Sequence, residues 1–170
     1  MSHAEHEARS RERRGSVAFA VITVSDTRTA ETDTGGALLQ ELLTAAGHTV
    51  IHKSICRDDE VADRLAEVLR NPACEAAALT GGTGLGPRDL AVDLVERLYT
   101  ARIPGFGELF RMLSWDEIGA GAMLSRASAG VIEGRVIFAL PGSRNAIRLA
   151  VEKLVAPGAP HLVWELKGRA

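Results

Sequence analysis

The run VAFAVITVS at residues 17–25 is the feature that most limits what this chain can fold into. It is an almost continuous apolar run rich in Val and Ile, which is typical of a strand buried on both faces. Such strands occur in parallel sheets, and neighbouring parallel strands must be joined by long crossovers that are usually helices. The run therefore predicts an α/β fold.

Helical and strand patterns alternate along the chain after this run. Apolar residues at helical spacing predict a helix over 38–46, ended by Gly47, and a second helix over 61–69, with Asp58 as its expected N-cap. Residues 49–55 and 75–80 read as further strands. Right-handed crossovers between these strands place helices on both faces of a mostly parallel sheet.

The second half of the chain is less regular. A helix is expected to begin near Asp89, and glycines and a proline break the pattern over residues 101–130. Regularity returns with a strand over 135–140, a helix over 147–155 and a tail, 157–167, that we expect to pack back on the body. We predict a single domain over residues 17–170.

Composition excludes several classes of protein. The net charge is -2, and aromatic residues make up 4% of the chain, so neither a basic surface nor a stacking platform for nucleic acid is expected. No apolar run approaches the ~18 residues of a membrane span. Residues 1–16 read as a disordered charged tail, and Cys56 and Cys74 as reduced thiols, so we expect a cytoplasmic protein.

The turns that follow the predicted strands carry the candidate chemistry. In open parallel sheets these turns meet at one edge, where ligands bind. Here they span residues 25–36, 56–60, 80–89 and 141–145, and they contain carboxylates and glycines. This combination predicts a site for phosphate and a divalent metal.

The sequence TGGTGLG at residues 80–86 is the strongest single signal. Glycine lets the backbone approach a ligand, and we expect the next helix to point free amides at an anion. A tight turn needing positive φ is the structural alternative. The loop lacks the Lys of a Walker A motif, and a dinucleotide fingerprint would follow the first strand. An oxidoreductase is therefore disfavoured.

Individual side chains around this loop stay open to two interpretations. Asp58 and Asp89 are suited to a hard cation or to ordinary helix capping, and Arg88 can reach a phosphate. Glu108 and Arg111 read in isolation as a turn with a surface ion pair. The histidines offer no base at useful spacing and no nucleophile elbow exists, so covalent hydrolase chemistry is disfavoured.

Several motifs together resemble the molybdopterin-binding family of molybdenum cofactor biosynthesis. They are VSD at 24–26, TGGTG at 80–84 followed by Arg88 and Asp89, GFGELFRMLS at 105–114, SRA at 125–127 and LPGS at 140–143. The resemblance implies a three-layer α/β/α molybdopterin-binding fold assembled as homo-trimers or homo-hexamers. It also implies a protein that uses ATP and Mg²⁺ to adenylylate molybdopterin, with no tightly bound cofactor. The alternative is a non-catalytic molybdopterin-binding or carrier protein.

The resemblance also implies roles for particular residues. Asp58 and Asp89 would be the catalytic and metal-holding acids. The residues expected to bind substrate or phosphate are Ser25, Asp33, Gly36, Thr80, Gly81, Gly82, Thr83, Gly84, Arg88, Glu108, Pro141, Gly142 and Ser143.

Overall fold

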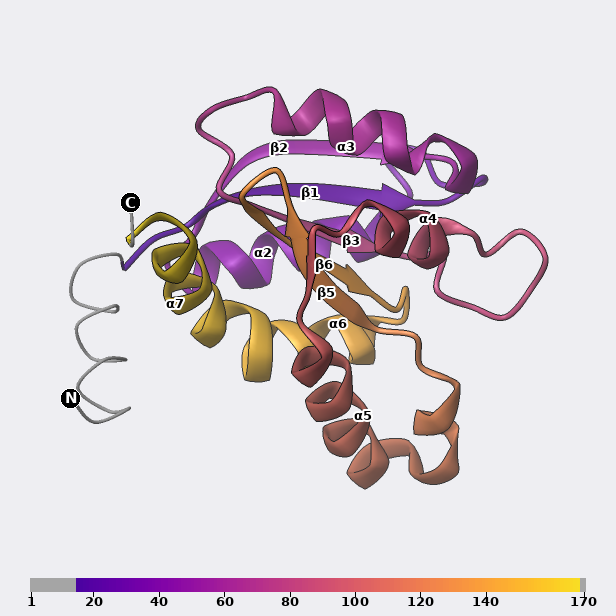
Figure 1. Ribbon diagram of the computed structural model, residues 1–170. Coiled ribbons are helices and arrows are strands. Elements are labelled where there is room, and N and C mark those ends of the chain that lie inside the picture. Colours follow the sequence, from indigo (N-terminus) through magenta and orange to yellow (C-terminus); the bar gives the residue numbers. More distant parts are fainter. Residues whose placement is uncertain (1–14, 169–170) are drawn as a thin grey trace.

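The computed structural model describes residues 15–168 and contains one six-stranded sheet between two layers of helices (Figure 1). The strand order is β2-β1-β3-β6-β5-β4. The first four strands in this order are parallel, and β5 and β4 join antiparallel. The strands are β1 (Ala18–Val24), β2 (Thr49–Cys56), β3 (Ala76–Thr80), β4 (Ala101–Arg102), β5 (Ser128–Ile132) and β6 (Arg135–Leu140).

The helices divide between the two faces of the sheet. One face is covered by α2, α5, α6 and α7, and the other by α3 and α4. Two 3₁₀ segments and a π-helical turn, η3, complete the chain. The bounds are α2 (Thr34–Ala45), η1 (Asp58–Glu60), α3 (Val61–Leu69), α4 (Ala91–Leu98), α5 (Pro104–Ile118), η2 (Gly119–Leu124), α6 (Arg144–Ala150), η3 (Val151–Val155) and α7 (Ala156–Lys167).

The alternation of side chains along β1 explains the two cores. Phe19 and Val21 pack with α2 and α6, whereas Ala20 and Ile22 pack with α3 and α4. All are fully buried, so β1 is apolar on both faces as its sequence predicts. The three-layer, mostly parallel α/β/α prediction is confirmed.

Residues 101–130 are more regular than predicted. They contain a 15-residue helix, α5, and the two antiparallel strands. Pro104 stands in the first turn of α5, where it is compatible with a helix, and Gly107 lies inside it. A Cβ on Gly107 would lie 2.7 Å from the Ala127 carbonyl oxygen, so this glycine permits close packing and does not break the helix.

The C-terminal segment packs back on the body, as predicted. The last helical stretch runs from α6 through η3 into α7, which buries Ala159 and Val163 against the sheet. Within residues 15–168, no helix has the length and apolarity needed to cross a bilayer. The predicted tail over residues 1–16 falls almost wholly outside the described residues.

Candidate functional site

The turns after β1, β3 and β6 meet at the carboxyl edge of the sheet because these strands are neighbours. The Ser25 amide donates to the Cys56 carbonyl at 2.9 Å, and the Gly81 amide donates to the Leu140 carbonyl at 3.1 Å. Thr80 Oγ1 donates to the Pro141 carbonyl at 3.2 Å. These bonds join residues that are 31, 59 and 61 positions apart in sequence, at the place where open α/β sheets bind ligands.

The glycine loop is built by its first two residues. Gly81 has φ of 102° and Gly82 has φ of 64°, values that favour glycine. A Cβ on Gly81 would lie 2.3 Å from the Val24 carbonyl oxygen. Among the described residues, the amides of Gly82, Thr83 and Gly84 have no recorded acceptor. The loop is therefore a tight positive-φ turn, and it leaves these three amides without a recorded acceptor among the described residues.

One cavity beside this loop, here called the α2–α6 hollow, lies between the starts of those two helices. Its lining includes Ser25, Arg28, Gly81, Ser143 and Arg144, and its volume is about 340 Å³. Hydroxyls, backbone and two guanidinium groups face it. These groups suit an anion such as a phosphate.

Asp33 lines the same hollow but is engaged in the fold. Its carboxylate accepts the Gly36 amide at 2.8 Å and the Thr23 hydroxyl at 2.9 Å, and it lies 3.6 Å from Lys53 Nζ. The Gly36 amide at the start of α2 is thus already bonded. A Cβ on Gly36 would lie 2.3 Å from both Asp33 Oδ2 and Thr23 Oγ1, so Gly36 and Asp33 form one capping unit.

Ser143 has an equivalent role at the start of α6. Its hydroxyl accepts the Ala146 amide at 3.2 Å. Arg144 Nη1 donates to the Thr34 carbonyl at 3.3 Å, which links the beginnings of α6 and α2. Ser143 therefore shapes the wall of the hollow while its hydroxyl hydrogen stays available to a ligand.

A second cavity, here called the α3–α4 hollow, lies on the other side of Ser25. It is lined by Asp26, Asp58, Gly82, Arg88 and Asp89 and has a volume of about 330 Å³. Arg88 Nη1 lies 3.9 Å from Asp26 Oδ2. Three carboxylates and one arginine make this hollow acidic. The two predicted catalytic acids are brought together here.

Asp58 does not cap its own helix, contrary to the prediction. It is the first residue of η1, whose N-cap is Arg57. Its Oδ1 atom instead accepts the amides of Leu90 and Ala91, at 2.9 and 3.0 Å, and so caps α4 from 32 and 33 positions away. Two of the amides expected to be free at the start of the helix after the glycine loop, those of Leu90 and Ala91, are therefore already bonded.

Asp89 precedes α4 and bonds within the loop. Its Oδ2 atom accepts the Gly86 amide at 2.9 Å. Within the described part of the chain, Asp58 Oδ2 and Asp89 Oδ1 have no recorded hydrogen-bond donor, and no group of three or more His, Cys, Asp or Glu side chains is placed to hold a metal. The acidic hollow offers two carboxylates with unused oxygens.

Glu108 lies apart from both hollows. It lines a third cavity, between α4, α5 and β5, together with Arg102 and Arg111. Within the described chain the structure therefore does not place Glu108 beside Asp58, Asp89 or Ser143. Its neighbour Arg111 donates to the Ser125 carbonyl at 3.4 Å. In the same cavity, burial raises the pKa of Glu96, but hydrogen bonds from Arg102 and Ser128 outweigh it and leave the pKa lowered.

Two arginines were missed as site residues by sequence reasoning. Arg28 lines the α2–α6 hollow from the turn after β1, and Arg126 holds the glycine loop. Neither belongs to a periodic pattern. The SRA motif at 125–127 was the one signal for Arg126.

The thiol nearest this edge is not a nucleophile. Burial raises the pKa of Cys56 to about 11, Arg64 lowers it, and Glu60, Asp58 and Asp59 raise it further. The group stays protonated at neutral pH. Both described cysteines are free thiols, as predicted.

Comparison with known proteins agrees with this architecture. The profile of a family described as "Probable molybdopterin binding domain" matches residues 20–161. Molybdenum cofactor biosynthesis protein B of Bacillus anthracis is 45% identical over 149 residues, covering 86% of this chain and 88% of that protein. The Bacillus subtilis protein of the same name is 43% identical over 150 residues, with the same coverage.

Solved structures give the same result. A crystal structure of a molybdenum cofactor biosynthesis protein B has a TM-score of 0.87 at 42% identity and covers 91% of this chain and 98% of its own. The tungsten cofactor synthesizing protein MoaB from Pyrococcus furiosus has a TM-score of 0.81 at 31% identity, covering 91% and 99%. The chain thus belongs to the molybdopterin-binding domain family, among the molybdenum cofactor biosynthesis B proteins.

Proposed function

We propose that this protein binds molybdopterin and transfers AMP from ATP to its terminal phosphate, releasing pyrophosphate. The single observation that carries the proposal is the pair of adjoining hollows that share Val24 and Ser25. One is lined with hydroxyls and arginines, and the other with carboxylates. A phosphate nucleophile and a nucleoside triphosphate must bind next to each other, which requires two adjoining sites.

The reaction requires no side chain to act as a nucleophile or as a general base. A phosphate oxygen of molybdopterin attacks the α-phosphorus of ATP, the bond from that phosphorus to the bridging oxygen breaks, and pyrophosphate leaves. The attacking phosphate is already ionised, so no general base has to remove a proton. What the chain must supply is alignment of two anions and compensation of their charge.

The α2–α6 hollow would hold the terminal phosphate of molybdopterin. Arg28 and Arg144 would balance its charge, and Ser143 would donate its hydroxyl hydrogen. The amides of Gly82, Thr83 and Gly84 have no recorded acceptor among the described residues, and of these three residues Gly82 lines the α3–α4 hollow. Backbone amides of this kind stabilise phosphates without a change in protonation.

The α3–α4 hollow would hold Mg²⁺ and the triphosphate. Mg²⁺ commonly takes one or two protein carboxylates and completes its shell with water and phosphate oxygens. Asp58 and Asp89 each keep one carboxylate oxygen without a recorded donor in the described chain, which fits that requirement. When bound, Mg²⁺ supplies positive charge to the phosphates, and Arg88 would add to it.

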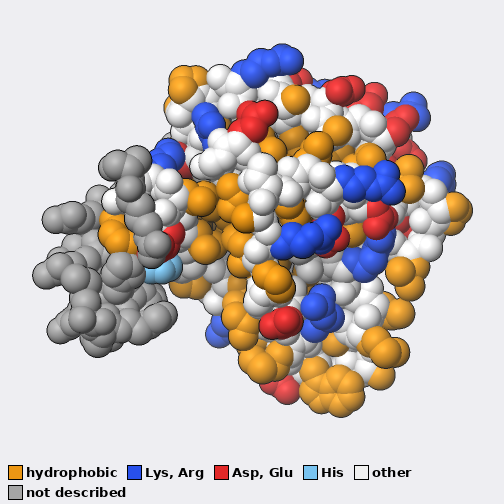
Figure 2. Space-filling model, in the orientation of Figure 1, with side chains coloured by type: hydrophobic (Ala, Val, Ile, Leu, Met, Phe, Trp, Pro, Cys, Tyr) orange, Lys and Arg blue, Asp and Glu red, His pale blue; other side chains and the backbone are white. Residues whose placement is uncertain are grey.

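We also propose that the protein is a homo-oligomer, a trimer or hexamer. Exposed apolar side chains gather on the outer surface of α5 and η2, which extend away from the sheet (Figures 1 and 2). Monomers rarely expose large apolar patches. The side chains are Leu109, Met112, Trp115, Ile118, Met123 and Leu124, between 46% and 78% exposed.

Light scattering tests the assembly. Trp115→Glu should reduce the particle mass, whereas Leu166→Glu, which changes an exposed leucine on α7, should leave it unchanged. A wild-type mass of one chain would contradict the proposal.

The enzymatic test uses purified protein, molybdopterin, ATP and Mg²⁺. Pyrophosphate and adenylylated pterin are followed together, the latter by mass spectrometry. Asp89→Asn should lose product, and Asp59→Asn should not, because Asp59 is exposed and pairs with Arg57 outside the hollow. Tight binding of molybdopterin without product would identify a binding or carrier protein instead.

A further inference from the structure

We infer that Arg126 is a positioning residue that fixes the glycine loop and, through it, the relative placement of Asp58 and Asp89. The inference rests on the proposed function, since it gives those two acids a shared task. Arg126 lies between η2 and β5, outside every turn that lines the two hollows. It has no contact with the hollows of its own and acts through the loop.

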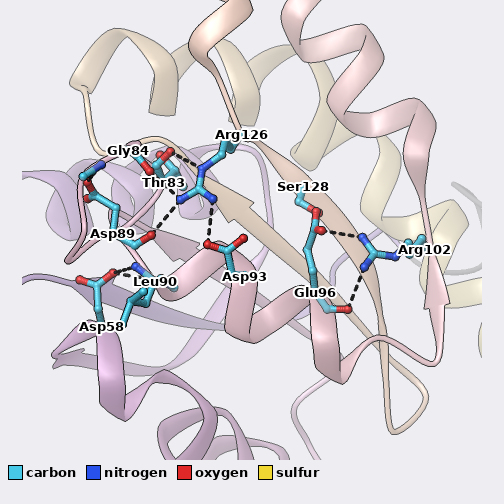
Figure 3. A network of polar contacts seen from close by, with 12 residues as sticks. Asp58, Thr83, Gly84, Asp89, Leu90, Asp93, Glu96, Arg102, Arg126 and Ser128 are labelled. Carbon is cyan, nitrogen blue, oxygen red and sulfur yellow. Dashed lines mark hydrogen bonds and ion pairs between the residues drawn. The ribbon is translucent and has the colours of Figure 1, made fainter.

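The guanidinium of Arg126 bonds four acceptors of one chain segment. Nε donates to the Thr83 carbonyl at 3.2 Å, and Nη2 donates to the carbonyls of Gly84 and Asp89, the latter at 2.8 Å. Nη1 pairs with the Asp93 carboxylate at 2.8 Å. Figure 3 shows the guanidinium between Thr83 and Gly84 of the loop, the Asp89 backbone and Asp93 in the first turn of α4.

The loop has few other anchors. Residues 84–88 are exposed, and Leu85 is 70% exposed, so apolar packing does not hold them. The Arg126 side chain is 25% exposed, which makes its hydrogen bonds stronger than those of a fully hydrated arginine. A rigid planar fork with several donors matches this task, whereas a lysine ammonium does not.

Bonds to carbonyls also decide where the amides point. In a trans peptide the C=O and the following N–H point in opposite directions. By holding the carbonyls of Thr83 and Gly84, Arg126 turns the amides of Gly84 and Leu85 to the opposite side of the loop. The guanidinium thus orients donors that it does not touch.

The peptide between Asp89 and Leu90 links Arg126 to the two acids. Its carbonyl accepts from Arg126 at 2.8 Å, and its amide donates to Asp58 Oδ1 at 2.9 Å. Arg126 and Asp58 therefore form hydrogen bonds to opposite sides of one peptide unit (Figure 3). Because this unit follows the Cα of Asp89, losing Arg126 would let Asp89 shift against Asp58.

Hydrogen exchange tests the positioning directly. Arg126→Met keeps an apolar stem and removes all four hydrogen bonds, and we expect at least 5-fold faster exchange at the Leu90 and Ala91 amides, which bond Asp58. Arg102→Met is the matched control, since Arg102 lines the same cavity as Arg126 but pairs with Glu96. Exchange at Leu90 and Ala91 should not change in the control.

Kinetics separate positioning from a general structural role. For Arg126→Met we expect kcat to fall at least 10-fold and the Mg²⁺ concentration for half-maximal rate to rise, with KM for molybdopterin within 2-fold of wild type. Arg126→Lys should lose at least 5-fold in kcat although its charge is kept. It also serves as the test variant if Arg126→Met does not fold.

The outcomes of the two proposals are distinguishable. If the wild-type protein makes no product, the proposed function fails, and Arg126 is judged on exchange and on calorimetric affinity for Mg²⁺ with ATP, which should weaken at least 5-fold. Wild-type exchange in Arg126→Met, or equal activity of Arg126→Lys and wild type, would overturn the inference. So would a rise in KM for molybdopterin with unchanged kcat.

Discussion

The α2–α6 and α3–α4 hollows differ in chemistry although they flank the same strand end and have nearly equal volumes. In the first, one oxygen of Asp33 accepts the Gly36 amide and the other accepts the Thr23 hydroxyl, and two arginines line the space. In the second, Asp58 and Asp89 each keep one oxygen without a recorded donor, and Arg88 is the one arginine that residues 15–168 contribute to the lining. The difference teaches that a carboxylate can cap a helix with one oxygen and keep the other for a ligand, as Asp58 does, unless a second donor such as the Thr23 hydroxyl takes it.

The largest effect on turnover is expected from a side chain at Gly82 that fills part of the α3–α4 hollow and leaves the α2–α6 hollow unchanged. In Gly82→Ala, the new Cβ would lie 2.5 Å from both Asp58 Oδ1 and Ala91 Cβ, at φ of 64°. We expect a loss of about 2 kcal/mol in the free energy of unfolding and of about 100-fold or more in turnover. Thermal unfolding and the pyrophosphate assay measure the two effects.

Gly35→Ala is the matched control in the other hollow, because its Cβ would have only ordinary contacts, at 3.5 Å or more. A fully active Gly82→Ala variant would show that the acidic hollow is not where the chemistry takes place.

A large effect on rate without an effect on stability is expected for Asp58→Asn. The amide oxygen can still accept from Leu90 and Ala91, so α4 keeps its cap, but the negative charge is lost. We expect turnover to fall about 100-fold, equal to about 2.7 kcal/mol. Asp58→Ala should lose about 1 kcal/mol of stability in addition. Equal turnover of Asp58→Asn and wild type would refute a role for its charge.

A moderate effect, confined to binding, is expected for the arginines of the other hollow. In the double variant Arg28→Met and Arg144→Met, KM for molybdopterin should rise about 10-fold, or about 1.4 kcal/mol, while kcat stays constant. Arg148→Met is the control, since Arg148 is on α6 but pairs with Glu152. Steady-state kinetics measure both parameters. A fall in kcat with unchanged KM for molybdopterin would mean that the α2–α6 hollow does not bind the molybdopterin phosphate.

The smallest effect is expected from Gly35→Ser. Position 35 lies inside α2, its φ is not positive, and an added Cβ would be 3.5 Å from Ile147 Cδ1. Replacing a helical glycine should therefore raise the free energy of unfolding by about 0.5 kcal/mol. Thermal unfolding at constant pH measures this change. A lower melting temperature would mean that the α2–α6 hollow is more tightly packed than its contacts indicate.

Sequence patterns predicted the part of the fold that depends on local periodicity. The strand over residues 135–140 matches β6, and the helices of the parallel units lie where apolar spacing places them. α5 was missed because Gly105 and Gly107 resemble breakers, whereas the reason for Gly107 is the carbonyl of Ala127, 20 positions away. Strand β5 pairs antiparallel with β6, and no local signal specifies that partner.

The candidate site was predicted in its members but not in their connections. Asp58, Asp89 and the glycine loop come together as expected from the ends of parallel strands. That Asp58 caps α4, and that Arg126 bonds Thr83, Gly84 and Asp89, depends on pairs separated by 32 or more positions. Side-chain pairing over such separations leaves no periodic trace in a single sequence.

The cap that Asp58 provides to α4 has a consequence for the order in which ligands arrive. One oxygen of Asp58 already compensates the positive end of a helix, so a cation at this carboxylate competes with the helix for its charge. Asp58, weakened in this way, and Asp89, whose Oδ2 atom accepts the Gly86 amide, should hold a free divalent ion only loosely. We therefore expect the metal to enter already bound to the nucleotide and to leave with the pyrophosphate, which would keep the empty protein metal-free between turnovers.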